Sequence, residues 1–276
     1  MTEKFQIFFP TQQRSELGSG LLQLSDTSLA NISKAYIAPG ENIERYTAIT
    51  KELMKNSMTA GIIRATPKIK AIFFDMDATV IHQESIVELS KAAGKQDEVE
   101  KITEEAMAGK IDFEEALRQR VAMLEGLPGS IIEATAKNLT VFDGLKIVAQ
   151  KAVNAGIELH LISGGFLPLA EKIAKPMGFT GWQANQLEIK ANYLTGKVHG
   201  NIIDGLAKQT YVKTIMKKND WNKEEVVVVG DGANDMHMMS EAGISIGFNP
   251  KSILIAQINL GNFSGNHLLL EDILFN

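Results

Sequence analysis

The sequence predicts an α/β protein built on a doubly wound parallel sheet, with a helical cap inserted after the first core strand and a small N-terminal α/β unit. Three observations support this prediction. Short apolar runs alternate with longer helical stretches from residue 71 onward, which is typical of parallel sheets covered by helices on both faces. Several helical stretches, rather than one, separate the first two apolar runs. The residues before 67 form a pattern of their own.

We expect residues 1–66 to form the small N-terminal unit and residues 67–276 to form the main domain. The boundary is placed at Thr66–Lys68, because Pro67 cannot donate a hydrogen bond to a central strand ladder. The unit contains no motif with an assignable chemistry, so its role stays open. Its expected elements are three strands, at residues 5–9, 34–37 and 61–64, and one helix, at residues 41–58.

The first strand of the main domain is the apolar run Ala71–Phe74, which ends abruptly in two aspartates. A right-handed crossover to the next parallel strand needs only one helix, so surplus helices predict a cap over the strand ends, at about residues 82–142. A helix near residues 145–155 then returns the chain to the sheet. The expected helices of the cap, separated by glycine-containing turns, are residues 85–94, 98–109, 113–124 and 131–138.

Later apolar runs complete the predicted sheet. Residues 157–162 form a strand that is followed by Ser163–Gly165, and a helix begins near Phe166. Residues 187–190 and 197–199 indicate a hairpin around Tyr193–Gly196. The nearly pure β-branched run Val226–Val229 is typical of a buried strand, and residues 244–248 form a shorter strand after it.

Polar residues follow three of these strands, at the edge where parallel sheets bind their ligands. Carboxylates that meet in one crevice repel each other, so either some stay protonated or a cation lies among them. Oxygen ligands without cysteine or paired histidine favour a hard cation, and Mg²⁺ fits best. The residues are Asp75 and Asp77 after the first strand, Ser163 and Gly164 after the second, and Asp231, Asn234 and Asp235 after the valine run.

Each of these features also has an ordinary structural explanation. An aspartate after a strand often begins a turn or caps a helix, and Ser163–Gly165 alone fits a plain glycine turn. A helix N-terminus with a nearby serine hydroxyl, however, attracts an anion, and beside an acidic metal site that anion is most simply a phosphate. His82 and His237 lie near the motifs without metal-ligand spacing, so we interpret them as non-ligands.

This assembly suggests phosphoryl transfer. A carboxylate can attack phosphorus to form an aspartyl-phosphate, which water then hydrolyses. A metal ion and a positive side chain offset the charge on the transferring oxygens, and a second carboxyl group protonates the leaving alcohol and later deprotonates water. Asp75 and Asp77 supply both groups, and spacing alone does not decide which of them attacks.

Over about residues 70–250 the chain resembles the haloacid dehalogenase superfamily and, within it, the phosphoserine phosphatases. Asp75–Thr79, Ser163–Gly165 and Gly230–Asp235 look like the first, second and fourth motifs of the family, in the family's order. Residues 98–120 resemble the cap of the phosphoserine phosphatases. The chain departs from the pattern at Ala78, where those enzymes usually have serine, and after residue 248.

The resemblance implies a role for each motif residue. Asp75 would be the nucleophile and Asp77 the general acid and base. Ser163 and Gly164 would hold the phosphate together with Lys208, which matches the lysine of the third motif. Composition and spacing alone do not single this lysine out from 28 basic residues.

The metal ligands and the substrate contacts are likewise implied by the resemblance. Mg²⁺ would bind the Asp75 side chain, the Asp77 backbone carbonyl and the Asp231 side chain, with Asp235 behind these ligands. In the cap, Glu84 would bind a substrate ammonium and Arg120 a carboxylate, for which a planar guanidinium is well suited. The remaining implied substrate contacts are Met107 and Phe113, which would close an apolar lid, and Asn234.

Composition limits the other classes of function. The 276 residues are 45% hydrophobic and 22% charged, which is ordinary for a soluble globular protein. A net charge of −5 without a basic run gives no indication of a nucleic-acid surface, and the absence of cysteine excludes disulfides. The sequence has no bilayer-length apolar stretch and no signal-peptide pattern, so we expect a cytoplasmic protein without a membrane partner. Whether it forms a homodimer stays open.

The leading hypothesis is a Mg²⁺-dependent phosphatase that converts O-phospho-L-serine to L-serine, in serine biosynthesis. A phosphatase or phosphotransferase for another small phosphorylated metabolite is the nearest alternative, because Ala78 and the C-terminal segment depart from the family. A phospho-acceptor signalling switch belongs to a different class, and Asp77 argues against it, since a switch gains little from a hydrolytic acid and base. A non-enzymatic interaction protein is disfavoured because no catalytic position is missing.

Overall fold

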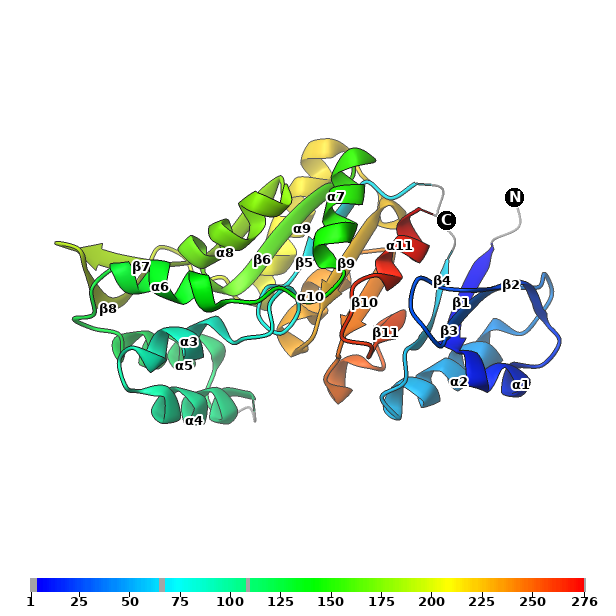
Figure 1. The fold of residues 1–276 in the computed structure, drawn as a ribbon, viewed down its shortest axis with the longest axis horizontal. Coiled ribbons are helices and arrows are strands. Elements are labelled where there is room, and N and C mark those ends of the chain that lie inside the picture. The colour runs from blue at the N-terminus through cyan, green and yellow to red at the C-terminus, as the bar shows by residue number, and fades with distance from the viewer. Residues whose placement is uncertain (1–3, 65–67, 108–109, 276) are drawn as a thin grey trace.

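The computed structural model describes residues 4–64, 68–107 and 110–275. Within these residues, eleven strands form one continuous sheet in the order β2-β3-β1-β4-β11-β10-β9-β5-β6-β7-β8 (Figure 1). The N-terminal unit lies at one end of the molecule's long axis and the cap helices α3–α5 lie toward the other end, with the main sheet between them (Figure 1). The predicted mixed α/β fold with a parallel core is confirmed.

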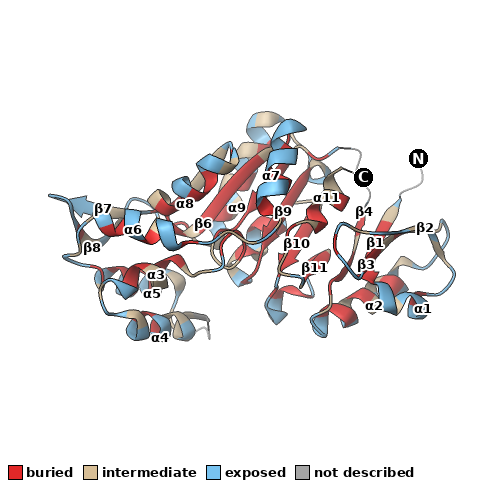
Figure 2. Cartoon of the chain, in the orientation of Figure 1, coloured by how far each residue is buried: buried red, intermediate tan, exposed pale blue. Residues whose placement is uncertain are grey.

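The core of the sheet is parallel, and β5 lies at its centre between β6 and β9. Phe74 pairs with Leu161 on one side and with Val229 on the other, so these strands leave the sheet at the same edge. All residues of β5 and β9 are buried, as Figure 2 shows, which is why both strands are continuous apolar runs. The parallel strands are β5 (Ala71–Phe74), β6 (Glu158–Phe166), β7 (Gly181–Lys190), β9 (Val226–Gly230), β10 (Ile244–Phe248) and β11 (Leu260–Asn262).

Alternate residues of β5 face two different apolar clusters. Ile72 and Phe74 pack into the cluster that holds α7 and α8, whereas Ala71 and Phe73 pack into the cluster that holds α9 and α10. The sheet is therefore covered on both faces, as a doubly wound fold requires. The covering helices are α7 (Leu145–Asn154), α8 (Leu167–Ala174), α9 (Gly205–Asn219), α10 (Met236–Met239) and α11 (Leu269–Leu274).

The cap is a group of four helices inserted between β5 and α7. A hairpin formed by β7 (Gly181–Lys190) and β8 (Tyr193–His199) extends the sheet toward it, and Leu194 exchanges backbone hydrogen bonds of 2.9 and 2.8 Å with Gly126 and Leu127. The hairpin at the edge of the sheet is thus hydrogen-bonded directly to the cap. The cap helices are α3 (Ser85–Lys91), α4 (Gln96–Met107), α5 (Phe113–Ala122) and α6 (Ser130–Asn138).

Two local predictions differ from the structure. The hairpin turns at Ala191 and Asn192, with φ of 48° and 67°, and Tyr193–Gly196 lies inside β8. Gly196 suggested a turn at its own position, but the turn is formed by Ala191 and Asn192, which adopt positive φ although they are not glycines. In addition, β6 does not end at residue 162 but continues through Ser163–Gly165 to Phe166, with a register shift against β7.

The N-terminal unit has the split βαβ strand order, β2-β3-β1-β4, and all its strand pairs are antiparallel. The sequence did not indicate β2, an edge strand with mostly exposed residues, or the one-turn helix α1. β4 also pairs with β11, so the unit and the main domain share one sheet. Its elements are β1 (Phe5–Pro10), α1 (Arg14–Leu17), β2 (Leu21–Asp26), β3 (Ile32–Ile37), α2 (Ile43–Lys55) and β4 (Ala60–Arg64).

A helix that spans a membrane needs sufficient length and hydropathy. None of the described helices combines the length and the apolar character that a bilayer crossing requires.

The junction between β4 and β11 leaves no room for a side chain at Gly61. A Cβ atom there would lie 2.5 Å from Leu260 Cα. We expect Gly61→Ala to lower the free energy of unfolding by about 2–3 kcal/mol, the cost of overpacking a close backbone contact. Urea unfolding measures this, with Gly129→Ala as control, because its Cβ would approach no atom closer than 3.4 Å. Equal losses in both variants would contradict the packing of this junction.

Candidate active site

Three carboxylates meet where β5 and β9 leave the sheet. Asp75 follows β5 directly, Asp231 follows β9, and Asp235 lies in the turn after it; all three are buried. One carboxylate oxygen from each lies within 4.8 Å of the others. The shared register of β5 and β9 brings these residues together, although 156 positions separate Asp75 from Asp231 in the chain.

Lys208 is the positive partner of this acidic cluster. It lies in the first turn of α9, which begins where Asp204 Oδ1 accepts a hydrogen bond from the Ala207 amide, and its side chain is 1% exposed. Its ammonium donates to Asp75 Oδ1 at 2.7 Å and to Asp235 Oδ1 at 2.8 Å. Although burial opposes the charge, Asp235 and Asp75 raise the pKa of Lys208.

The Asp75 carboxyl is poised between its two protonation states. Burial and the repulsion of Asp235 raise its pKa to about 7, while the Lys208 ammonium works in the opposite direction. Its second oxygen, Oδ2, lies 3.5 Å from Asn234 Nδ2. Any added positive charge at this position would therefore ionise Asp75 fully at neutral pH.

Asp77 has a different environment. Its Oδ2 accepts a hydrogen bond of 2.8 Å from the Ser85 hydroxyl, whereas its Oδ1 is buried without a partner. Burial, followed by the charges of Glu84 and Asp75, raises the pKa of Asp77 well above its usual range. A carboxyl group with a raised pKa keeps its proton to a higher pH, which is the property that a general acid needs. The sequence did not indicate Ser85, because a serine at a helix start is usually a cap.

The loop after β9 is shaped around Asp235. The backbone amides of Asp231 and Gly232 donate to Asp235 Oδ2 at 3.0 and 3.2 Å. A Cβ atom on Gly230 would lie 2.5 Å from the carboxyl carbon of Asp235, so a glycine is needed there. This arrangement explains in physical terms why glycine and aspartate alternate in this motif.

Lys251 is a second cation that sequence reasoning missed. Its Nζ lies 3.0 Å from Asp231 Oδ2, and its backbone amide donates to the Asp231 carbonyl at 2.9 Å. Burial and Asp235 raise the pKa of Asp231 to about 6, and Lys251 opposes them. A lysine in a loop after a strand carries no local signal that distinguishes it from a solvated one.

The second motif lies beside the cap. Ser163 is buried, and its Oγ accepts a hydrogen bond of 2.8 Å from the Gly165 amide. A Cβ atom on Gly164 would lie 2.9 Å from Phe113 Cζ, so the ring of Phe113 covers this glycine. The cap helix α5 thus reaches the motif through Phe113.

Two of the predicted substrate residues, Glu84 and Arg120, interact electrostatically with Asp77. Glu84 is half-buried and acts electrostatically on Asp77 and Arg120. Arg120 is buried and donates to the Ala116 carbonyl and to Thr103 Oγ1, both at 3.1 Å. Burial lowers the pKa of Arg120, and Glu84 and Asp77 oppose that shift. The side chain of Met107 lies outside the described part of the structure.

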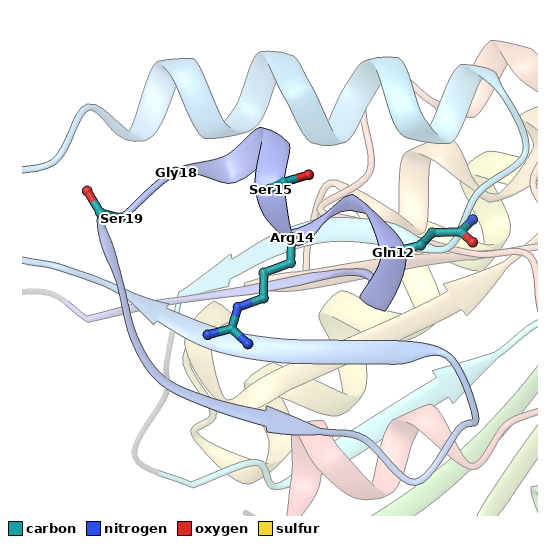
Figure 3. A pocket seen from close by; sticks show the side chains of 5 residues that line it. All are labelled: Gln12, Arg14, Ser15, Gly18 and Ser19. Carbon is teal, nitrogen blue, oxygen red and sulfur yellow. The ribbon is translucent and has the colours of Figure 1, made fainter.

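A separate surface hollow of about 570 Å³ lies in the N-terminal unit (Figure 3). In Figure 3 the side chains of Gln12, Arg14 and Ser15 point in different directions instead of converging, and no carboxylate lines the hollow. The acidic cluster, rather than this hollow, is therefore the candidate active site.

The acidic cluster fits a hard divalent cation. Its donors are carboxylate oxygens, which Mg²⁺ prefers, and Lys208 and Lys251 contact only one oxygen each of Asp75 and Asp231. When ionised, the three carboxyl groups of the cluster outnumber the ammonium groups of Lys208 and Lys251, so a bound cation would offset the excess negative charge. The orphaned Asp77 Oδ1 shows that the site also has polar capacity for a ligand.

Comparison with known proteins identifies the family. The sequence model of haloacid dehalogenase-like hydrolases matches residues 72–240. The chain belongs to this family. It is 41% identical over 185 residues to the phosphoserine phosphatase of Archaeoglobus fulgidus, and the aligned region covers 67% of this chain and 54% of that protein. It is 40% identical over 187 residues to the phosphoserine phosphatase of Methanocaldococcus jannaschii, which covers 68% of this chain and 89% of that one.

Solved structures of this family agree with the fold. A phosphoserine phosphatase, solved as a phospho-aspartyl intermediate analogue, matches 75% of this chain and 99% of its own at 36% identity, with a TM-score of 0.71. A haloacid dehalogenase family hydrolase from Salmonella enterica matches 100% of this chain and 99% of its own at 23% identity, with a TM-score of 0.88. The second match extends the shared fold to the N-terminal unit.

The raised pKa values predict how stability depends on pH in protein kept free of metal with EDTA. The carboxyl groups of Asp75 and Asp231 bind protons up to about pH 7 and 6 when folded, but only up to about pH 4 when unfolded. The folded state therefore holds more protons between pH 4 and 7, and stability should fall as the pH rises through this window. The loss is on the order of 1 kcal/mol per pH unit for each group, between about pH 4 and 7 for Asp75 and between about pH 4 and 6 for Asp231.

Urea unfolding at pH 4.5, 6 and 8, with EDTA or with Mg²⁺, measures this dependence. Because the cation binds the ionised carboxylates, Mg²⁺ should stabilise the protein far more at pH 8 than at pH 4.5. A Mg²⁺ effect that is equal at both pH values would contradict binding at this cluster.

Proposed function

We propose that this protein is a Mg²⁺-dependent phosphomonoester hydrolase that converts O-phospho-L-serine to L-serine and phosphate through an aspartyl-phosphate on Asp75. The observation that carries the proposal is the pairing of a carboxyl group beside a buried ammonium, Asp75, with a second buried carboxyl group of raised pKa two residues later, Asp77. The phosphoserine phosphatases with 40–41% identity supply the substrate class. A role in serine biosynthesis follows as part of this proposal, because L-serine is the product.

Asp75 and Asp77 divide the chemistry between them. The Asp75 carboxylate attacks phosphorus and displaces the serine oxygen, and Asp77 donates its proton to that oxygen as the P–O bond breaks. Water then attacks the phosphorus of the aspartyl-phosphate, gives its proton to Asp77, and releases inorganic phosphate and free Asp75. Lys208 would stabilise the charge on the transferring oxygens, and its ammonium favours the ionised form of Asp75 against burial and the repulsion of Asp235.

The bound cation would neutralise phosphate charge and hold the reacting oxygens in place. We assign its ligands to the Asp75 and Asp231 side chains and the Asp77 backbone carbonyl, with Asp235 fixing the loop behind them. Ser163 and Gly164 would hold the phosphate at the end of β6. Asn234 would contact the substrate from its place beside Asp75.

Glu84 and Arg120 would recognise the amino-acid part of the substrate. Glu84 acts electrostatically on Asp77 and Arg120, and Asp77 acts on Arg120, so the three charged groups lie close enough to serve one small substrate. A carboxylate and a guanidinium match the ammonium and the carboxylate of a zwitterion. Phe113, which covers Gly164, and Met107 would close the site from the cap.

Asp75→Asn tests the nucleophile. An amide cannot form the acyl-phosphate, so turnover of phosphoserine in saturating Mg²⁺ should fall by at least about 10⁴-fold, the scale found when a covalent nucleophile is removed. Release of inorganic phosphate is the measurement. Asp220→Asn, at an exposed helix end, is the control and should keep full activity. Normal turnover by Asp75→Asn would refute the mechanism.

Arg120→Ala tests recognition of the substrate carboxylate. Loss of a charge-assisted hydrogen bond should raise KM for phosphoserine about 10- to 150-fold and leave KM for an aryl phosphate nearly unchanged. The matched control is Arg118→Ala, an exposed arginine of the same helix that pairs with Glu114. Equal effects of Arg120→Ala on both substrates would argue against carboxylate recognition.

A second candidate, a phosphatase or phosphotransferase for another small metabolite, rests on Ala78. This residue has φ of 55°, a left-handed conformation that alanine adopts at a cost, and it lacks the serine hydroxyl that the family usually has there. Release of phosphate from a panel of phosphorylated metabolites, with and without acceptor alcohols, separates the two candidates.

A further inference from the structure

We propose that Asn185 is a positioning residue that holds the two phosphate-binding segments of the site, the Gly164 segment and the Lys208 helix, in fixed relation to each other. This inference rests on the proposed phosphoryl transfer at the site. Asn185 lies on β7 and is completely buried, although its amide is polar at both ends.

The donor end of the Asn185 amide contacts the end of β6. Ile162 pairs with Gln183, and the next pairing is Phe166 with Asn185, so four steps along β6 correspond to two along β7. Residues 163–165 therefore bulge out of the backbone ladder, a local departure typical of functional sites. The bulge leaves the Gly164 carbonyl without a strand partner, and Asn185 Nδ2 donates to it at 2.8 Å.

The acceptor end of the Asn185 amide contacts the segment just before α9. The other end of the same amide, Asn185 Oδ1, accepts a hydrogen bond of 2.8 Å from the Ile203 backbone amide. Asp204 follows immediately as the cap of α9, and its carbonyl accepts from the Lys208 amide at 2.9 Å. Asn185 therefore binds the backbone one residue before the cap that sets the position of Lys208.

One side chain thus joins two segments that belong to different strand–helix units. Only an amide offers a donor at one end and an acceptor at the other in this shape. If the side chain is removed, the half-buried Gly164 carbonyl and the buried Ile203 amide lose their partner, and the protein relaxes most cheaply by moving one segment away from the other. A displacement of about 1 Å between catalytic groups lowers rates on the order of 100-fold.

The decisive measurement is the affinity for inorganic phosphate, which both segments would hold. In Asn185→Ala, loaded with Mg²⁺, we expect calorimetry to show at least a 10-fold weaker affinity for phosphate than in the wild type. We also expect kcat/KM to fall on the order of 100-fold for phosphoserine and for an aryl phosphate alike, because the phosphate is common to both.

Asn259 provides a matched control. Its Oδ1 likewise bridges polar groups, accepting from the Ser245 amide and hydroxyl at 2.8 Å each, but it lies between β10 and β11. Asn259→Ala should lower the thermal midpoint to a similar extent and keep phosphate affinity within 2-fold of the wild type. A merely structural role for Asn185 predicts that both variants behave in this way, and wild-type phosphate affinity in Asn185→Ala would overturn the proposal.

Asn185→Asp preserves side-chain volume and provides a second variant if the alanine substitution prevents folding. It keeps an acceptor for Ile203 and loses the donor to Gly164, so phosphate affinity should again fall at least 10-fold. Unchanged affinity in this variant would also overturn the proposal. If the wild-type enzyme fails to hydrolyse phosphoserine, the proposed substrate is wrong, and the phosphate affinities of the variants still decide the role of Asn185.

Discussion

The buried ammonium of Lys208 is the interaction on which the rest of the site depends. Asp75 and Asp235 are almost completely buried, and two carboxylates in that position would repel each other without a cation between them. Lys208 reaches them only because α9 begins at Asp204, against the carboxyl edge of the sheet. The parallel sheet, the loop after β9 and the first turn of α9 therefore form one electrostatic unit.

Asp75 and Asp77 lie two residues apart in different electrostatic environments, as the two proposed roles require. Asp75 contacts an ammonium, which favours its ionised form. Asp77 accepts from the Ser85 hydroxyl instead, and its burial and the nearby charge of Glu84 favour its protonated form. Since Ser85 and Glu84 lie at the start of the first cap helix, the cap contributes to the raised pKa of Asp77 in addition to covering the site.

Local patterns predicted the central strands and their polar ends, because a buried parallel strand leaves an uninterrupted apolar run such as Val226–Val229. Contacts between distant elements left no such trace. Lys208 was found only through family resemblance, and Ser85 and Lys251 look locally like a helix cap and a solvated lysine. The three-residue strand β11 and the edge strand β2 were missed because their residues obtain partners only in the assembled sheet.

The N-terminal unit is connected to the main domain through the sheet and through several hydrogen bonds, of which those of Lys51 lie nearest in sequence to Lys251. β4 pairs with β11, the strand next to β10, and Lys251 follows β10. From α2, Lys51 Nζ donates to the carbonyls of Ile255 and Ile258 at 2.6 and 2.5 Å, in the segment immediately after Lys251. The unit therefore contacts the segment that follows Lys251, and Lys251 in turn contacts Asp231. This chain of contacts links residues 4–64 to the acidic cluster.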